Sequence, residues 1–376
     1  MDFDYVVVPA FVLLIGILVV WLSVRRILAL SSKGYRTLRK VAERIVLLPL
    51  IVISVVVAGS AAYNATVLCW FRAHNHPPGE TYMVDGHKMH MVCMGSGSPT
   101  IVLDAGLGND ALIWGGIQPE LAKTTRVCAY DRAGFGWSEA RPAPRDADHI
   151  AAELQGLLRE AKVEGPIVLM GHSISGIYMR DYATRYQADI AGIVFVDGST
   201  PMQQENPAFK SAFSKGPPQW VGELIQRSLM DVGVPRLFGQ CSRKMPGFDA
   251  HASKLQAEDL CHAQIGASMA EMNSMDRSGQ ETIHSGPYGA LPILIFSQDP
   301  NKGSGGMPPA IAAAWNQMQE DLKKLSTRSK RIIAKGSTHY VQLDRAELIE
   351  KEVPLFIQQI RGAAPEPTNY GSTITE

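Results

Sequence analysis

A serine between small residues follows an apolar run that has the pattern of a buried strand. Residues 167–176 read IVLMGHSISG, so Gly171 lies two residues before Ser173 and Ser175 lies two residues after it. Residues 174–186 then show helical periodicity. A strand, a sharp turn and a helix can present a serine hydroxyl as a nucleophile, and the turn demands small flanking residues. Ser173 is therefore a candidate for nucleophilic attack on an acyl carbon.

Ser175 stands where glycine is usual in this type of turn, and Gly176 follows at once. If Ser175 were the nucleophile, Ile177 would lie two residues after it and would crowd the approach of the helix to the strand. Ser173 is favoured for that reason. A neutral serine hydroxyl is a weak nucleophile, so a nearby base must accept its proton.

Three further motifs lie beside predicted strands. Residues 103–109 read LDAGLGN, residues 130–139 read YDRAGFGWSE and residues 336–344 read GSTHYVQLD. Together with the serine motif they resemble the α/β-hydrolase superfamily, whose members carry an oxyanion loop, a D-R-x-G-x-G-x-S segment, the nucleophile and the catalytic histidine in this order. The resemblance covers residues 80–361, and four motifs in the family's order are more specific than any one of them.

The resemblance implies a catalytic triad. His339 would take the proton from Ser173 and later return it to the leaving group. Asp299, after the apolar run 293–296, is the expected acid, and Asp197, after the preceding apolar run, is the alternative. The acid would hold the imidazole in one tautomer and stabilise its charged form.

Two backbone N–H groups are expected to form an oxyanion hole, one at Ile174 after the nucleophile and one at Leu107 in the glycine-containing loop. Such a donor is typically worth about 10²–10³-fold in turnover. His172 neighbours the nucleophile in sequence and is expected to shape the turn or the pocket. Asp131 and Arg132 are expected to make a buried structural pair near the site.

The chain alternates short apolar runs with helical patterns, which indicates an α/β fold with a mostly parallel sheet and helices on both faces. Residues 81–199 and 289–361 are the predicted α/β-hydrolase core. Residues 200–288 contain no convincing strand and are predicted to form an inserted helical lid, which would control access to the site. Residues 362–376 are predicted to be a disordered tail. The expected strands cover residues 101–103, 127–130, 167–170, 193–196, 293–296 and 331–334, after a hairpin turn at Asp85-Gly86.

Two uncharged apolar segments precede the core, residues 5–24 and 45–71. Each is long enough to cross a bilayer as a helix, which takes about 20 residues. Basic short loops stay in the cytoplasm, so the sequence predicts two transmembrane helices within residues 1–72, a linker over 73–80 and a hydrolase domain on the extracytoplasmic side. A signal peptide cleaved after the second segment is the alternative, and it leaves the domain on the same side. The segment between the two is basic, with Arg25, Arg26, Lys33, Arg36, Arg39, Lys40 and Arg44 against Glu43.

Composition excludes some partners and leaves others open. Lysine plus arginine total 36, as do aspartate plus glutamate, so the net charge is zero and no basic face for nucleic acid is indicated. The five cysteines show no zinc-type spacing, and neither a metal nor a cofactor is expected. Cys241 and Cys261 are the candidates for a disulfide in an oxidising compartment, and two free thiols are the alternative.

These observations predict a serine hydrolase that cleaves carboxylic esters, of lipids or other acyl substrates, through an acyl-enzyme on Ser173. Its expected partners are a small-molecule acyl substrate and the lipid bilayer. Amide or peptide hydrolysis and acyl transfer remain open, because the same triad performs them. The alternative from another class is a non-catalytic, membrane-tethered binding protein with this fold, and retention of serine, histidine and acid argues against it. Substrate identity and oligomeric state do not follow from the sequence.

Overall fold

The computed structural model describes residues 4–32, 37–213, 219–242, 244, 250–262, 265–302 and 308–376. The chain forms two compact units. One contains residues 1–76, 218–243 and 257–263, and the other contains residues 77–217, 244–256 and 264–376.

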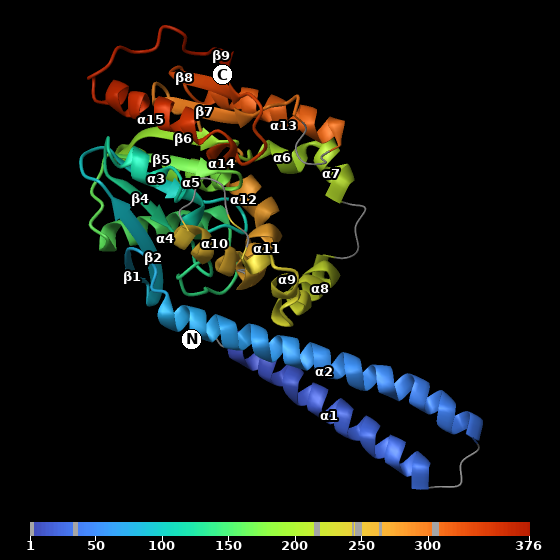
Figure 1. The fold of residues 1–376 in the computed structure, drawn as a ribbon. Coiled ribbons are helices and arrows are strands. Elements are labelled where there is room, and N and C mark those ends of the chain that lie inside the picture. Colours follow the sequence, from blue (N-terminus) through green and yellow to red (C-terminus); the bar gives the residue numbers. More distant parts are fainter. Residues whose placement is uncertain are drawn as a thin grey trace. The chain divides into compact units, whose positions relative to one another are not determined.

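The second unit is built on a sheet with the strand order β1-β2-β4-β3-β5-β6-β7-β8-β9 (Figure 1). Strand β2 pairs antiparallel with β1 and β4, and all the other neighbouring strands are parallel, so the expected mostly parallel sheet is confirmed. The strands are β1 Glu80–Val84, β2 His87–Met94, β3 Thr100–Asp104, β4 Val127–Tyr130, β5 Ile167–His172, β6 Ile190–Val196, β7 Ile293–Gln298, β8 Ser329–Ala334 and β9 Thr373–Thr375.

The first hairpin and the central strands follow directly from their residues. Asp85 and Gly86 both have positive φ, +47° and +82°, which is the backbone that a two-residue hairpin turn requires. Every residue of β3, β4 and β5 is buried. Parallel strands that are covered on both faces are apolar throughout rather than alternating, which explains the continuous apolar runs in the sequence.

Two hydrophobic cores lie on opposite faces of the sheet. Val102 and Leu169 pack into the core that contains α4 and α5, whereas their strand neighbours Ile101 and Val168 pack into the core that contains α15. The helices of this sandwich are α3 Gln118–Leu121, α4 Ala147–Glu160, α5 Ser175–Arg185, α13 Pro309–Asp321, α14 Val341–Asp344 and α15 Ala346–Ile360, with short 3-10 helices η1 Ala111–Trp114, η2 Gln187–Asp189 and η4 Leu322–Leu325.

The described part of the segment between β6 and β7 is helical, as expected for the lid. Its helices are α6 Met202–Glu205, α7 Pro207–Phe213, α8 Gln219–Asp231, α9 Val234–Leu237, η3 Gln240–Ser242, α10 Ala250–His262, α11 Ile265–Asn273 and α12 Met275–Thr282.

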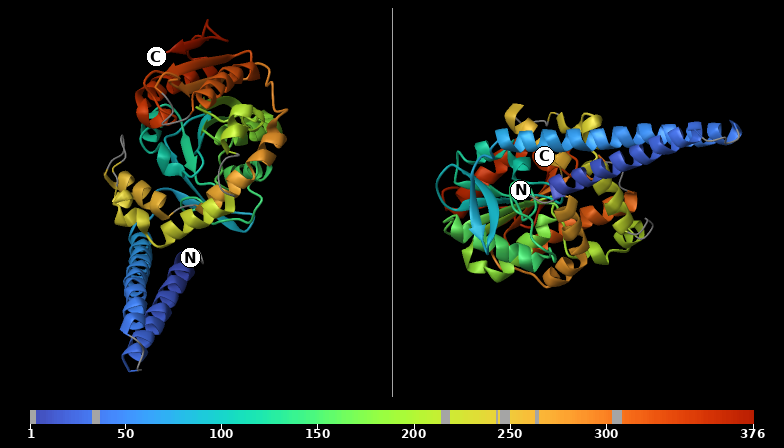
Figure 2. Two further views of the ribbon diagram at one scale, coloured as in Figure 1. Left: turned by 90° about the vertical axis from the view of Figure 1, so that its right-hand side faces the viewer. Right: turned by 90° about the horizontal axis from the view of Figure 1, so that it is seen from below.

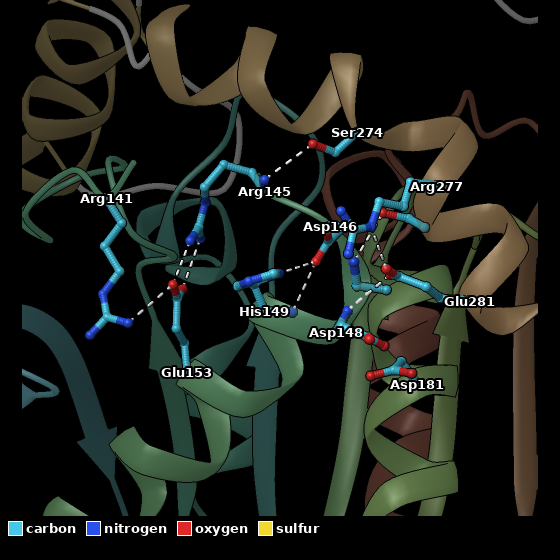
Figure 3. Close-up of polar contacts among 12 residues, drawn as sticks. Arg141, Arg145, Asp146, Asp148, His149, Glu153, Asp181, Ser274, Arg277 and Glu281 are labelled. Atoms are coloured by element: carbon cyan, nitrogen blue, oxygen red, sulfur yellow. Dashed lines mark hydrogen bonds and ion pairs between the residues drawn. The ribbon is translucent and has the colours of Figure 1, made fainter. Parts of the chain in front are cut away.

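The last part of this segment completes the start of α4. Ser278 Oγ accepts a hydrogen bond from the N–H of Ala147 at 3.0 Å, and a carboxylate oxygen of Glu281 accepts one from the N–H of Asp148 at 3.2 Å. The first N–H groups of a helix have no partner within it, so these side chains satisfy donors that would otherwise be unpaired. Figure 3 shows the same junction, where Ser274 also binds the backbone of Arg145.

The first unit contains two long antiparallel helices, α1 Asp4–Ser32 and α2 Thr37–His74 (Figures 1 and 2). Both are long and apolar enough to cross a membrane. Arg26 donates two hydrogen bonds to the carboxylate of Glu43, at 2.7 and 2.9 Å, near the connection between the helices. A Cβ at Gly16 would lie 2.8 Å from that of Ala58, so glycine permits the close approach of α1 to α2.

Two disulfides are present among the described residues, and Cys69 is a free, exposed thiol. The bond between Cys241 and Cys261 confirms the expected pairing. The bond between Cys93 and Cys128 was not expected. These residues face each other on the antiparallel strands β2 and β4, a register that depends on the sheet order and cannot be read from their spacing.

The prediction of a disordered tail over residues 362–376 is wrong. Thr373–Thr375 form β9, which pairs parallel with the outer side of β8. Lys335 donates its backbone N–H to the carbonyl of Glu376 at 2.7 Å, and the N–H of Glu376 bonds Ile333 at 3.0 Å. A strand at a sheet edge presents unpaired backbone groups, and the short Thr-Ile-Thr sequence satisfies those of β8.

Candidate active site

Ser173 lies in a tight turn between β5 and α5, with a left-handed backbone at φ +55°. Its carbonyl accepts hydrogen bonds from the N–H groups of Ser199 and Gly176, at 2.7 and 2.9 Å. A Cβ at Gly171 would lie 2.0 Å from Ser175 Oγ, so only glycine fits there. A left-handed backbone at a non-glycine residue costs free energy and persists only where the surroundings impose it. The expected nucleophile turn is therefore present at Ser173.

His339 lies in the loop between β8 and α14 and reaches the serine. Its Nε2 atom lies 2.9 Å from Ser173 Oγ, which places the hydroxyl as donor and the imidazole nitrogen as acceptor. A quarter of the His339 side chain is exposed. The expected proximity of these two residues is thus found in the structure.

Asp197, and not Asp299, is the acid that contacts His339. Asp197 Oδ2 accepts a hydrogen bond from His339 Nδ1 at 2.6 Å, and its other oxygen accepts one from the N–H of Gln298 at 3.1 Å. Asp197 is fully buried and has a left-handed backbone, φ +47°, immediately after β6. This turn directs the carboxylate toward the loop after β8.

The choice of Asp299 as the acid is therefore corrected. Its carboxylate accepts hydrogen bonds from the N–H groups of Gly336 and Asn301, at 2.8 and 2.9 Å. The Gly336 bond, followed by the Asn301 bond, lowers the pKa of Asp299 below its ordinary value. Asp299 thus holds the loop that leads to His339 by its backbone, and its oxygens are occupied there.

His172 supports the backbone of His339. Its Nε2–H donates to the carbonyl of His339 at 2.9 Å, and the two imidazole rings lie 4.5 Å apart. Burial, with a smaller contribution from His339, lowers the pKa of His172 well below its ordinary value. His172 is therefore neutral, with its proton on Nε2, and a positive charge does not lie beside the imidazole that accepts the serine proton.

The glycine-containing loop after β3 passes close to the nucleophile. A Cβ at Gly106 would lie 2.6 Å from His172 Nδ1 and 3.3 Å from Ser173 Cβ, so glycine is needed for this approach. Within the described ranges, the N–H groups of Leu107 and Ile174 donate to no protein acceptor. The loop is thus positioned beside Ser173, where the sequence predicted an oxyanion hole.

Arg132 holds this loop by its backbone carbonyls. The guanidinium donates to the carbonyls of Ala105 and Gly106, at 2.5 and 3.0 Å, and to the carboxylates of Asp104 and Glu271, at 2.7 and 2.8 Å. Burial opposes the charge of Arg132, but Glu271 and then Asp104 outweigh it and raise the pKa of Arg132 well above its ordinary value. Because Glu271 lies on α11, one cation joins the glycine-containing loop after β3 to the segment inserted between β6 and β7.

The expected pair between Asp131 and Arg132 is not formed. Asp131 instead binds His90 Nδ1 at 2.7 Å and accepts hydrogen bonds from the N–H groups of Ala111 and Trp137, at 2.8 and 2.9 Å. Neighbouring residues at the end of a strand point to opposite sides, so the two charges find separate partners.

An aromatic residue that the sequence did not single out also touches the site. Trp315 on α13 lies edge-on to the His339 ring with centroids 5.4 Å apart, and it packs with Phe209 of α7 in a small apolar cluster. Its position within a long helical pattern gave no signal of this contact. Among the described residues, no three His, Cys, Asp or Glu side chains are grouped as a metal site.

The model of the alpha/beta hydrolase family matches residues 101–352. An uncharacterized protein of Schizosaccharomyces pombe is 30% identical over 73% of this chain and 55% of its own length, so the chain spans about half of that relative. The uncharacterized protein YqjL of Bacillus subtilis is 26% identical over 72% of this chain and 88% of its own length.

Among solved structures, a membrane phospholipase A described as a bacterial virulence factor is similar in fold. It has a TM-score of 0.55 and 19% identity, and the match covers 86% of this chain and all of that protein. At this identity the likeness concerns the fold alone.

Substitution of Asp197 and of Asp299 should affect the reaction rate of Ser173 very differently. In Asp197→Asn, His339 loses the charge that fixes and stabilises its protonated form, and we expect the rate at which a fluorophosphonate modifies Ser173, with loss of fluoride, to fall by about 10⁴-fold, the size of effect that the corresponding change has on turnover in a well-studied serine protease. Asp299→Asn is the matched control and should change this rate only slightly. The measurement is the rate of reaction with a fluorophosphonate. A larger loss in Asp299→Asn than in Asp197→Asn would contradict the assignment.

Neutralising Glu271 should destabilise the second unit and slow the chemistry at Ser173. Glu271→Gln leaves Arg132 buried with one carboxylate fewer, and breaking a buried ion pair typically costs about 3–5 kcal/mol of the free energy of unfolding. Denaturant unfolding and fluorophosphonate reaction rates measure the two effects. Glu120→Gln, in the exposed pair with Lys123, is the control and should cost less than about 1 kcal/mol. Equal stability of the two variants would show that the buried pair is not needed.

Proposed function

Because the chain belongs to the alpha/beta hydrolase family, we propose that it is a serine hydrolase that cleaves carboxylic esters through an acyl-enzyme on Ser173. The observation that carries the proposal is the unbroken chain of hydrogen bonds from Ser173 Oγ through both nitrogens of His339 to Asp197. An aspartate at this turn would attack the substrate with a carboxylate oxygen, whereas this chain has a serine there, which attacks with its hydroxyl oxygen.

The proposed reaction has two halves. As Ser173 Oγ attacks the acyl carbon, His339 Nε2 takes the hydroxyl proton, and Asp197 stabilises the imidazolium through Nδ1. The negative oxygen of the tetrahedral intermediate would bind the N–H groups of Leu107 and Ile174. His339 then gives its proton to the departing alcohol. Water attacks the acyl-enzyme in the second half, with the same imidazole as base, and releases the acid and Ser173.

We further propose that the substrates include lipid acyl esters. Two helices that can cross a membrane are joined by a short segment to the second unit, called the hydrolase unit from here on, and they would hold the enzyme beside a bilayer. The solved membrane phospholipase A of similar fold is compatible with such a substrate but does not establish it. The same triad also allows amide cleavage and acyl transfer.

Labelling with a fluorophosphonate probe tests the nucleophile. Wild-type protein should be labelled, and Ser173→Ala should lose the label because the attacking oxygen is gone. Ser175→Ala is a matched control two residues away. Its fully buried hydroxyl has no hydrogen-bond partner in the described structure, so the variant should fold and keep the label. Label that persists in Ser173→Ala would refute the assignment. Label without turnover of any ester, thioester or amide would favour the non-catalytic binding protein.

We propose that the hydrolase unit lies on the extracytoplasmic side. The basic residues between α1 and α2 support a cytoplasmic loop, and the two disulfides are compatible with an oxidising compartment.

Protease added to intact cells tests this orientation. A C-terminal epitope should be digested from outside, whereas an epitope inserted between residues 33 and 36 should be protected until the membrane is permeabilised. The reverse pattern would place the hydrolase unit in the cytoplasm.

A further inference from the structure

Part of the segment predicted to be the lid belongs to the unit that contains the two apolar helices. Residues 218–243, which include α8 and α9, form one compact unit with α1 and α2. Helix α8 contacts both α1 and α2, and α9 contacts α2. Figure 2 shows α8 and α9 at the end of the helical pair where the N-terminus of α1 lies.

Two polar side chains of α2 bind the backbone at the end of α8. Ser60 Oγ donates a hydrogen bond to the carbonyl of Val232 at 2.5 Å, and Asn64 Nδ2 donates to the carbonyl of Met230 at 3.1 Å. Gly233 has φ +77°, and a Cβ there would lie 2.8 Å from that of Asn64, so glycine permits this packing. The last carbonyls of a helix have no partner within it. Here the carbonyl of Met230 accepts from the N–H of Gly233 as well as from α2, and that of Val232, just after α8, accepts from α2.

The position of these contacts along α2 sets their depth in a bilayer. The apolar stretch begins at Ile45, and at about 1.5 Å per residue Ser60 and Asn64 lie about 22 and 28 Å along it. A hydrocarbon core is about 30 Å thick, so a core that begins at Ile45 would contain both residues in its distal part. Polar groups at such depth need protein partners, and α8 and α9 provide them.

A charged residue in the same region is also paired. Arg236 of α9 donates to Asn64 Oδ1 at 2.9 Å and binds Glu258 through two further hydrogen bonds, at 2.7 and 2.9 Å. Both side chains of the ion pair are at least nine-tenths buried. The guanidinium therefore needs no water where α9 meets α2.

One exposed face of α8 and α9 is apolar. Its large residues are between 46% and 77% exposed, and the spacing of Ile225 and Leu229 places them on one face of α8. The exposed apolar surface of α2 is part of the same unit, with Ile53 at 59%. Exposed apolar patches of this kind mark surfaces that bind a protein, a membrane or a ligand. The residues of this patch are Leu224, Ile225, Leu229, Leu237 and Phe238.

We propose that α8 and α9 lie in the membrane interface and that this patch is immersed among the acyl chains of the leaflet on the hydrolase side. Lipid is the occupant favoured because the patch and the apolar helices belong to one unit, in which the carbonyls of Met230 and Val232 accept hydrogen bonds from α2. An amphipathic helix of this type binds a bilayer through its apolar face. The inference rests on the proposed membrane insertion of α1 and α2. It assigns membrane contact to α8 and α9, in the middle of the segment predicted to be the lid.

A depth measurement on the full chain in nanodiscs of phosphatidylcholine and phosphatidylglycerol tests this proposal. Cys69→Ala removes the free thiol, and single cysteines then replace Ile225 and Phe238 for labelling with an environment-sensitive fluorophore. We expect blue-shifted emission at both sites and strong quenching when the lipids carry brominated acyl chains. Ile53→Cys on α2 is the positive control. Met83→Cys in β1, exposed to the same extent as Ile225, is the negative control.

The outcomes separate the two proposals. Quenching at Ile53 without quenching at residues 225 and 238 would overturn the present inference and leave the membrane anchor intact. No quenching at Ile53 would refute membrane insertion itself, and the inference with it. Blue-shifted emission at 225 and 238 without quenching by brominated lipid would show that a protein surface covers the patch, and equal quenching at Met83 would show that the effect is not specific. Each of these last two results would also overturn the inference about α8 and α9.

Discussion

The hydrogen bond between the buried carboxylate of Asp197 and His339 Nδ1 is the interaction on which the site depends. A fully buried carboxylate is costly unless its oxygens are hydrogen-bonded, and here one oxygen accepts from His339 and the other from the backbone of Gln298. The imidazole is thereby fixed with its proton on Nδ1, which leaves Nε2 as an acceptor toward Ser173. The tautomer, the direction of the hydrogen bond to Ser173 and the orientation of the ring all follow from the position of one acid.

The loop that carries His339 is held from several directions so that this bond can form. Asp299 binds the backbone at Gly336, Asp344 accepts from the N–H of Thr338 at 2.6 Å, and His172 donates to the carbonyl of His339 itself. None of these contacts involves the reacting atoms. They restrict a surface loop that would otherwise lose its geometry through conformational freedom, and precise placement of the base is what makes it effective.

The sequence predicted the features that depend on neighbouring residues along the chain. It did not predict those that depend on which distant strands lie side by side. Ser173 could be identified because its turn tolerates only small neighbours, and Gly171 shows this requirement directly. Asp197 and Asp299 both follow parallel strands that end at the same edge of the sheet, so sequence alone could not establish which one reaches His339. The Cys93–Cys128 bond and strand β9 likewise depend on which strands become neighbours.

The inserted segment between β6 and β7 has different kinds of partner in two parts of its length. At its end, Glu271 binds Arg132, which in turn holds the carbonyls of the loop beside Ser173. In its middle, Met230 and Val232 satisfy polar groups of an apolar helix. The segment thus combines a buried ion pair in one part with exposed apolar side chains in another.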